Sequence, residues 1–353
     1  MKTLLLLTFI LIPGSLLMAQ TFSGDSILAN ERSIDRPITL HARQARITGG
    51  YGLSIISRRY NTEGEVVKLR DEGLSSIRHR FTLDLKYGIN DFIQLNASIA
   101  SSSNVVREQT RYIFPIEPEP VVMHDVTKEY SGLEDLYVGV DLRAPINTRK
   151  VDISLTLGAT LPVASYEPKE PEHSFEVQQE AGMNTNAFTY RYYYPLGRGI
   201  VIAQLGGMVK YRLPKWAFSA RVDYQHGLKD GKSYEWIHQL DNNSEFEYRQ
   251  DPFTYRLPDS FSYFAEAEYQ PLPWFDIFLN VSGFNASRGW TSPQEDLKVA
   301  LPDQSGIFLN PGFEIIITPR LWFRERITFA LSGKSHEAPF GFQTTLLYNF
   351  FPF

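Results

Sequence analysis

Two-residue alternation of apolar and polar side chains constrains the fold of this chain more than any other feature. In the clearest segment one face is apolar and the other polar or charged: Ile77, Phe81, Leu83 and Leu85 against Arg78, Arg80, Thr82, Asp84 and Lys86. Side chains alternate between the two faces of a β-strand, whereas a helix repeats every 3.6 residues or so, about twice that period. The alternation predicts twelve strands, at residues 46–57, 75–88, 92–103, 133–144, 150–163, 199–213, 216–227, 259–270, 274–285, 305–318, 320–333 and 340–351.

The connections between these predicted strands are short and long in turn. Most short ones span a few residues, as at 89–91, 145–149 and 214–215, and the long ones include 104–132, 164–198 and 228–258. Alternating strands also suit a soluble sandwich. Tight turns at one end and long loops at the other are typical of outer-membrane barrels, with turns in the periplasm and loops outside the cell. We therefore predict an all-β protein, an antiparallel transmembrane β-barrel of about 12 strands.

The N-terminus has the pattern of an export signal. Met1-Lys2-Thr3 is a short positive start, Leu4 to Leu17 is largely apolar, and the segment ends at the small residue Ala19. We predict a signal peptide at 1–19, a short periplasmic arm or plug at 20–45 and the barrel at 46–353. The chain has no cysteine, which excludes disulfides and a lipid-anchored cysteine. The expected location is the bacterial outer membrane, with outer-membrane lipid and lipopolysaccharide as partners.

Aromatic residues recur near the short turns, as in the interfacial girdle of a membrane barrel. They are Tyr87, Phe92, Tyr211, Trp216, Tyr269, Trp274, Phe275, Trp322 and Phe323. The last predicted strand also ends in aromatic residues, among them Tyr348, Phe350 and Phe351. This ending resembles the assembly signal of bacterial outer-membrane barrels.

If the apolar face of each strand meets lipid, the polar face lines the lumen. The predicted lumen-lining residues carry charges of both signs: Arg78, Arg80, Asp84, Lys86, Asp141, Arg143, Arg221, Asp223, Glu266, Glu268, Glu314, Arg324 and Arg326. A pore selective for ions of one sign would show rings of a single sign, and this set does not.

Strand order predicts specific partners for some of these charges. Arg324 and Arg326 would lie beside Glu314, and Arg221 would lie beside Glu266 or Glu268. Two hypotheses stay open for the whole set. It is either a paired network that fills a narrow barrel or a polar path for a solute.

The long loops contain carboxylates and aromatic residues. The carboxylates Glu117, Glu119, Glu167, Glu170 and Glu172 lack the spacing of a calcium loop, so we expect solvated acidic loops. The aromatic residues of 190–194 and 228–258 either contact an apolar or aromatic ligand, contact a protein partner, or extend the strands above the membrane. The sequence leaves these alternatives open.

Motifs of enzymes and nucleic-acid binders are missing. None of the seven histidines forms a His-Glu-x-x-His zinc pair. Leu228, two residues after His226, stands where outer-membrane phospholipases place the nucleophilic serine. The net charge of -5 gives no general attraction to nucleic acid. We therefore expect no catalytic, metal or cofactor site, no enzyme activity and no nucleic-acid partner.

Three short motifs resemble those of one family. Gly132-Leu133-Glu134-Asp135-Leu136 is similar to a strand start in the meta-pathway phenol-degradation family of outer-membrane proteins, which is distantly similar to long-chain fatty-acid channels. Residues 158–162 resemble its Leu-Pro strand end, and 310–312 with 318–319 resemble its late hairpin. The resemblance implies passive uptake or export of small hydrophobic or aromatic compounds. The alternative is a structural or partner-binding barrel that acts through its long loops.

Overall fold

The computed structural model describes residues 32–72, 74–113, 121–146, 150–165, 169–180, 183–194, 196–233, 236–241, 244–249, 253–287, 289–294 and 297–352. The predicted signal peptide, the start of the predicted arm and the loop carboxylates Glu117, Glu119 and Glu167 lie outside these ranges. Within them, the helical segments are two 3-10 turns, η1 (Ser33–Asp35) and η2 (Leu69–Glu72). No described helix has the length and apolar character of a membrane span.

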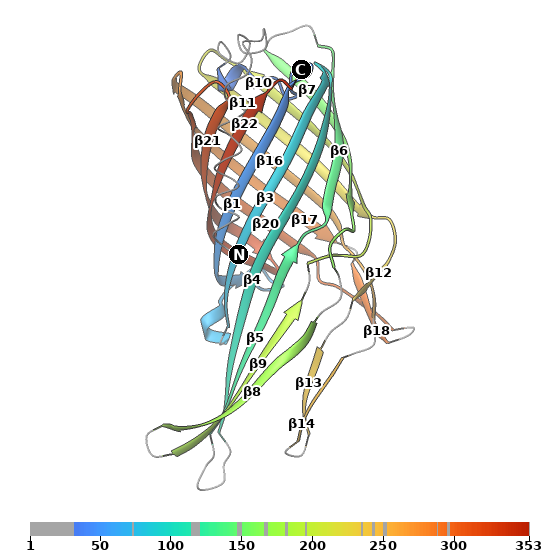
Figure 1. The fold of residues 1–353 in the computed structure, drawn as a ribbon, viewed down its shortest axis with the longest axis vertical. Helices are drawn as coiled ribbons and strands as arrows, with labels where there is room; N and C mark the ends of the chain where they lie inside the picture. Colours follow the sequence, from blue (N-terminus) through green and yellow to red (C-terminus); the bar gives the residue numbers. More distant parts are fainter. Residues whose placement is uncertain are drawn as a thin grey trace.

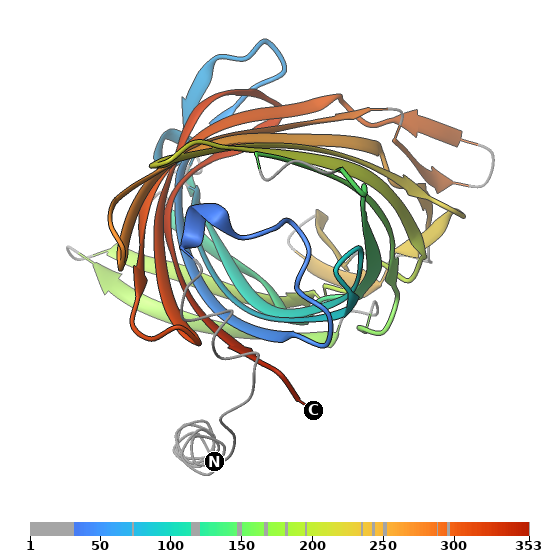
Figure 2. The ribbon, with the colours of Figure 1, turned by 90° about the horizontal axis from the view of Figure 1, so that it is seen from above.

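Twelve antiparallel strands close into a barrel (Figure 1, Figure 2). In chain order they are β1 (Ala45–Tyr60), β3 (Leu74–Asn90), β4 (Ile93–Ile113), β6 (Leu136–Arg143), β7 (Val151–Leu161), β10 (Ile202–Arg212), β11 (Trp216–Gly227), β16 (Asp259–Leu272), β17 (Phe275–Ser287), β20 (Gln304–Ile316), β21 (Leu321–Lys334) and β22 (His336–Phe350). Each pairs with the next in this series, and β1 pairs with both β3 and β22, which closes the ring. The predicted fold class and strand number are confirmed.

The barrel turns its apolar face outward. On β17, Ile277, Leu279 and Val281 are 37–47% exposed, whereas the alternating Asp276 and Asn280 are at most 5% exposed. Apolar side chains on the outer wall gain an apolar environment from lipid, while polar side chains inside find partners across the lumen. The alternation in the sequence therefore distinguishes the side chains that face lipid from those that face the lumen.

The long-loop end of the barrel contains further strands. They are β2 (Val66–Lys68), β5 (Val121–Leu133), β8 (Lys169–Glu180), β9 (Met183–Tyr194), β12 (Gly231–Ser233), β13 (Trp236–Asp241), β14 (Ser244–Arg249), β15 (Phe253–Arg256), β18 (Trp290–Gln294) and β19 (Leu297–Ala300). The aromatic residues of 190–194 lie on β9. The short-turn end, by contrast, has direct reversals such as the one between β3 and β4.

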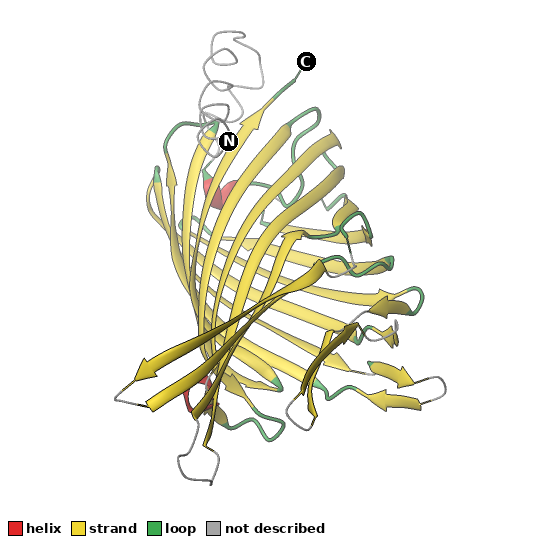
Figure 3. Ribbon diagram, turned by 60° about the horizontal axis from the view of Figure 1, so that its bottom comes forward, coloured by secondary structure: helices red, strands yellow, loops and turns green. Residues whose placement is uncertain are grey.

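A four-stranded sheet projects from the extracellular end. Strand β4 pairs with β6 from Ile93 to Ser98 and then with β5 from Ser101 to Ile113. Strand β5 pairs in parallel with β9, and β9 pairs with β8. Figure 3 shows this sheet, β4-β5-β9-β8, extending away from the barrel wall. Because β4 continues from the barrel wall into this sheet, it has 21 residues, about twice what a membrane crossing needs.

Most of the predicted girdle residues face outward near the short turns. Tyr87, Phe92, Tyr211, Trp216 and Trp274 are 39–53% exposed. The prediction for Trp322 is wrong, because its ring faces the lumen and is 4% exposed. It lies on the face of β21 that also carries Arg324, and an arginine of the N-terminal arm covers it.

Candidate solute pathway

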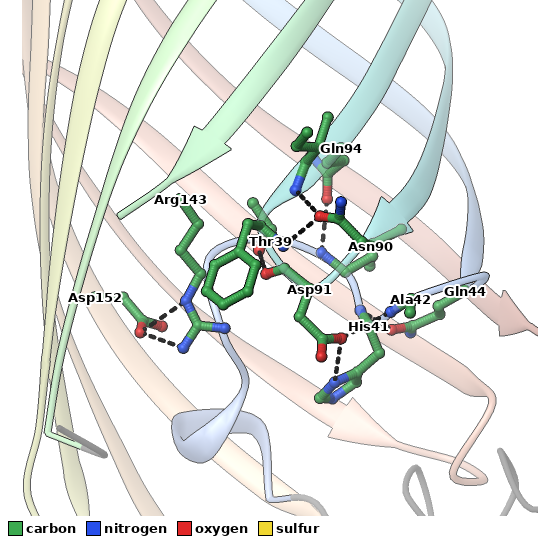
Figure 4. A network of polar contacts seen from close by, with 12 residues as sticks. Thr39, His41, Ala42, Gln44, Asn90, Asp91, Gln94, Arg143 and Asp152 are labelled. Carbon is green, nitrogen blue, oxygen red and sulfur yellow. Dashed lines mark hydrogen bonds and ion pairs between the residues drawn. The ribbon is translucent and has the colours of Figure 1, made fainter. Parts of the chain in front are cut away.

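The N-terminal arm, defined here as residues 32–44, lies inside the periplasmic end of the barrel (Figure 2). Its backbone bonds to side chains of the wall (Figure 4). The Leu40 N–H donates to Gln94 Oε1 at 2.9 Å, and the Ile38 N–H donates to Asp152 Oδ2 at 3.2 Å. Gln94 and Asp152 are each 1% exposed. These bonds satisfy extended backbone that has no strand partner of its own.

Arg36 fastens the arm to the barrel wall at β10, β20 and β21. Its Nη1 lies 3.5 Å from Glu314 Oε1, its guanidinium covers the Trp322 ring, and its carbonyl oxygen accepts from Arg212 Nη2 at 2.8 Å. Arg36 and Glu314 are both buried. A buried ion pair is stable only when both charges stay together, so this contact favours the seated arm.

Asp152 joins the arm to two wall arginines. Its carboxylate pairs with Arg143 Nη2 at 2.7 Å and with the Arg212 guanidinium, and it also accepts the arm's Ile38 N–H. Arg143 was a predicted lumen residue. The partner that holds it, Asp152, is on the neighbouring strand β7.

On the extracellular side of the arm the lumen contains a cavity of about 840 Å³. Its wall comes from β3, β4, β5, β6, β7, β10 and β11, the β5–β6 junction and the segment before β10. Six predicted residues line it: Arg78, Arg80, Asp84, Lys86, Asp141 and Arg221. The other seven predicted residues, which are not among its lining residues, are Arg143, Asp223, Glu266, Glu268, Glu314, Arg324 and Arg326.

The cavity arginines of β3 are paired with carboxylates that the sequence did not single out as lumen residues. Arg80 makes a two-bond contact with Glu134, with distances of 2.9 Å from Nε and 2.7 Å from Nη2. Arg78 Nη2 lies 2.8 Å from Glu337 Oε2. Glu337 precedes the predicted start of the last strand, and Glu134 stands at the break between β5 and β6.

The predicted partners of the other arginines hold only in part. Arg221 pairs with Asp223 on its own strand, at 2.6 Å, because residues two apart share a face, and not with Glu266 or Glu268. Arg324 does lie beside Glu314, at 4.0 Å, but its shorter contact is 2.6 Å to Glu266. Arg326 bonds to Gln343 on β22. Glu268 lies on the face of β16 that also carries Glu266.

Asp141 is held by neutral donors. Its carboxylate accepts from Gln94 at 2.9 Å, Asn96 at 2.8 Å and Thr156 at 2.6 Å. Lys86 lines the same cavity, and within the described residues it makes no ion pair. The cavity therefore has a polar wall in which three arginines, Arg78, Arg80 and Arg221, are paired with carboxylates, whereas Asp141 and Lys86 make no ion pair among the described residues.

The extracellular rim is fastened at Asp135. One carboxylate oxygen accepts the Ala164 N–H at 3.2 Å and the other accepts the Arg198 N–H at 2.9 Å. The Tyr255 hydroxyl donates to the Arg198 carbonyl at 2.5 Å. Burial raises the pKa of Tyr255, so the hydroxyl stays a donor. The loops before β6, after β7 and before β10 are thus held together beside the cavity.

Tyrosines continue from the projecting sheet into the cavity. Tyr194 of β9 stacks on Tyr130 of β5, with ring centroids 5.1 Å apart and planes at 20°. Tyr130 and Tyr137 both line the cavity. Sequence reasoning placed Tyr137 on the inward face of its strand but did not include it among the lumen residues. The available signal was its place in the alternation with Gly139 and Asp141.

No family model and no curated protein matches the chain. Solved outer-membrane barrels match its structure. An outer-membrane channel from Pseudomonas putida F1 has 13% identity and a TM-score of 0.59, covering 88% of this chain and 97% of that one. The translocator domain of the autotransporter NalP from Neisseria meningitidis has 9% identity and a TM-score of 0.48, covering 93% and 92%. The CymD monoaromatic hydrocarbon channel has 10% identity and a TM-score of 0.43, covering 88% of each.

The chain has the fold of a bacterial outer-membrane β-barrel. The outward apolar wall and the polar interior agree with a location in that membrane. At these identities the likeness concerns the fold alone, so a function must be argued from the barrel's own residues.

Proposed function

We propose that this barrel is a passive channel for small hydrophobic or aromatic compounds, in particular aromatic solutes that carry a polar group. The observation that supports this most is the tyrosine series Tyr194, Tyr130 and Tyr137, which runs from the projecting sheet into the cavity. Aromatic rings attract other rings in offset or edge-to-face arrangements. The series offers such a solute successive contacts on its way to the lumen.

The arrangement of charges in the cavity favours the passage of neutral solutes or zwitterions. Arg78, Arg80 and Arg221 each pair with a carboxylate, so the cavity presents no ring of one sign. A free ion gains little from such a wall. A ring with a polar substituent uses both the tyrosine faces and the hydrogen-bonding groups between them.

Two measurements test this proposal. Purified protein in planar bilayers should conduct, and a deletion strain should take up a panel of aromatic solutes more slowly than the parent strain. Plasmid-borne protein should restore the uptake rate. Absence of conductance, together with unchanged uptake across the panel, would refute the channel function.

A partner-binding barrel is the second candidate, and one observation favours it. Strand β8 ends the projecting sheet, and in the described residues no further strand pairs with its outer edge. An open edge of this kind is a template for pairing with another chain. The partner-binding hypothesis predicts that protein lacking residues 169–194 still conducts in bilayers but no longer restores uptake in the deletion strain. The channel proposal predicts that every variant that conducts also restores uptake.

A further inference from the structure

Tyr137 lies flat on the lumen wall because two glycines leave room for it. Gly139 of β6 and Gly158 of β7 are direct cross-strand partners. A Cβ atom added at either position would lie 2.5 Å from the phenol oxygen of Tyr137. At Gly158 the next nearest atoms are also of the Tyr137 ring, at 2.7 and 2.8 Å. The glycine pair is therefore a recess in which the ring rests.

The surroundings of this ring are already engaged with each other. Asp141, on the same face of β6, accepts three hydrogen bonds from wall side chains. Arg221 is held by two bonds to Asp223. The Tyr137 hydroxyl, by contrast, makes no hydrogen bond with another described residue, although the side chain lines the cavity. The ring face and the hydroxyl of Tyr137 are therefore available to contact a solute in the cavity.

We propose that Tyr137 is the specificity-determining residue of the channel, which selects planar aromatic solutes by stacking on their rings. This inference rests on the proposed channel function and names the contact that would give it selectivity. The recess has two effects. It holds the ring parallel to the wall, which is the orientation that offers a face to the lumen, and it keeps the ring out of the path.

The expected selectivity is modest. Aromatic pairing adds a preference of about two- to tenfold over area burial alone. A preference of this size shows in a comparison of two solutes that differ only in the ring. L-phenylalanine and L-cyclohexylalanine suit this purpose, because both are zwitterions that cross lipid poorly and they have similar size.

The experiment measures swelling of liposomes that contain the full-length channel in each of the two solutes. Wild type should admit phenylalanine about two- to tenfold faster than cyclohexylalanine. Tyr137→Ala should bring the ratio to about one and raise the rate for cyclohexylalanine, because the lumen widens. Tyr137→Phe should keep the ratio, and Tyr137→Leu should lose it while keeping a side chain of intermediate volume.

Variants of the recess test the role of the glycines. Gly158→Ala should push the ring into the cavity and slow both solutes. Gly207→Ala on the neighbouring strand β10 is the matched control, because an added Cβ there meets only an ordinary contact at 3.7 Å. Heat-modifiable migration on gels shows whether each variant has folded, and Tyr137→Leu replaces Tyr137→Ala if the latter has not.

The outcomes separate the two proposals. A wild-type channel that admits both solutes at equal rates overturns the role of Tyr137 and leaves the channel function standing. The same holds if Tyr137→Ala and Tyr137→Leu keep the wild-type ratio. A folded wild-type protein that conducts no ions and admits neither solute overturns the channel function itself.

Discussion

Asp152 is a buried charge of the barrel wall that pairs with two arginines. It is 1% exposed and pairs with Arg143 and Arg212, whose side chains are 22% and 7% exposed. Replacing it by asparagine preserves its shape and its acceptor for the Ile38 N–H, but removes the charge that both arginines need. Removing one partner of a buried ion pair typically costs about 3–5 kcal/mol, because the other charge is left uncompensated.

At about 1.4 kcal/mol per tenfold, this loss changes the unfolding equilibrium constant by roughly a hundredfold to several thousandfold. Urea titration of the folded barrel in lipid vesicles, followed by tryptophan fluorescence, measures the difference. Asp35→Asn is the matched control, because Asp35 also pairs with an arginine, Arg32, at 2.6 Å, with side chains 41% and 44% exposed. An exposed pair contributes at most about 1 kcal/mol. Equal, small losses in the two variants would refute the argument that the wall charges are buried and mutually dependent.

Two further predictions concern the arm and the lipid-facing wall. Gly88→Ala should displace the arm, because an added Cβ would meet the backbone carbonyl of His41, and the conductance of the channel should therefore rise. Gly49→Ala is the control: nothing lies within 4 Å of its added Cβ, so this variant should conduct like wild type. Val281→Arg places a charge in lipid near the middle of β17 and should cost about 2–4 kcal/mol in the same urea titration. Val66→Arg, in the extracellular hairpin, should cost less than 1 kcal/mol or so, and equal costs at the two positions would mean that the outer wall of β17 does not face lipid.

The sequence alone determined the class of fold and the two faces of its wall. A period of two residues is a local property, so the sequence of each strand indicates which of its side chains face lipid and which face the lumen. The short turns and long loops, read in order, then separated a membrane barrel from a soluble sandwich. Thirteen lumen charges could be named in this way, and six of them line the cavity.

The partners of those charges depend on information that no local pattern holds. Arg80 and Glu134 are 54 positions apart, and Arg36 and Glu314 are 278 apart. Which residues meet depends on strand register, on the stagger of the closed barrel and on where the arm docks. The sequence wrongly placed Trp322 at the membrane interface. It could not have done otherwise, because nothing in the residues around a turn shows that an arginine of the N-terminal arm will cover the ring.

The place of Tyr137 shows the same division. Alternation put the residue on the inward face of β6, together with Gly139 and Asp141. Only the pairing of β6 with β7 brings Gly158 beside Gly139 and so creates the recess under the ring. Which face a side chain occupies was therefore a property of the sequence, whereas what lies next to it was decided by the tertiary structure, because the register between paired strands sets which residues meet.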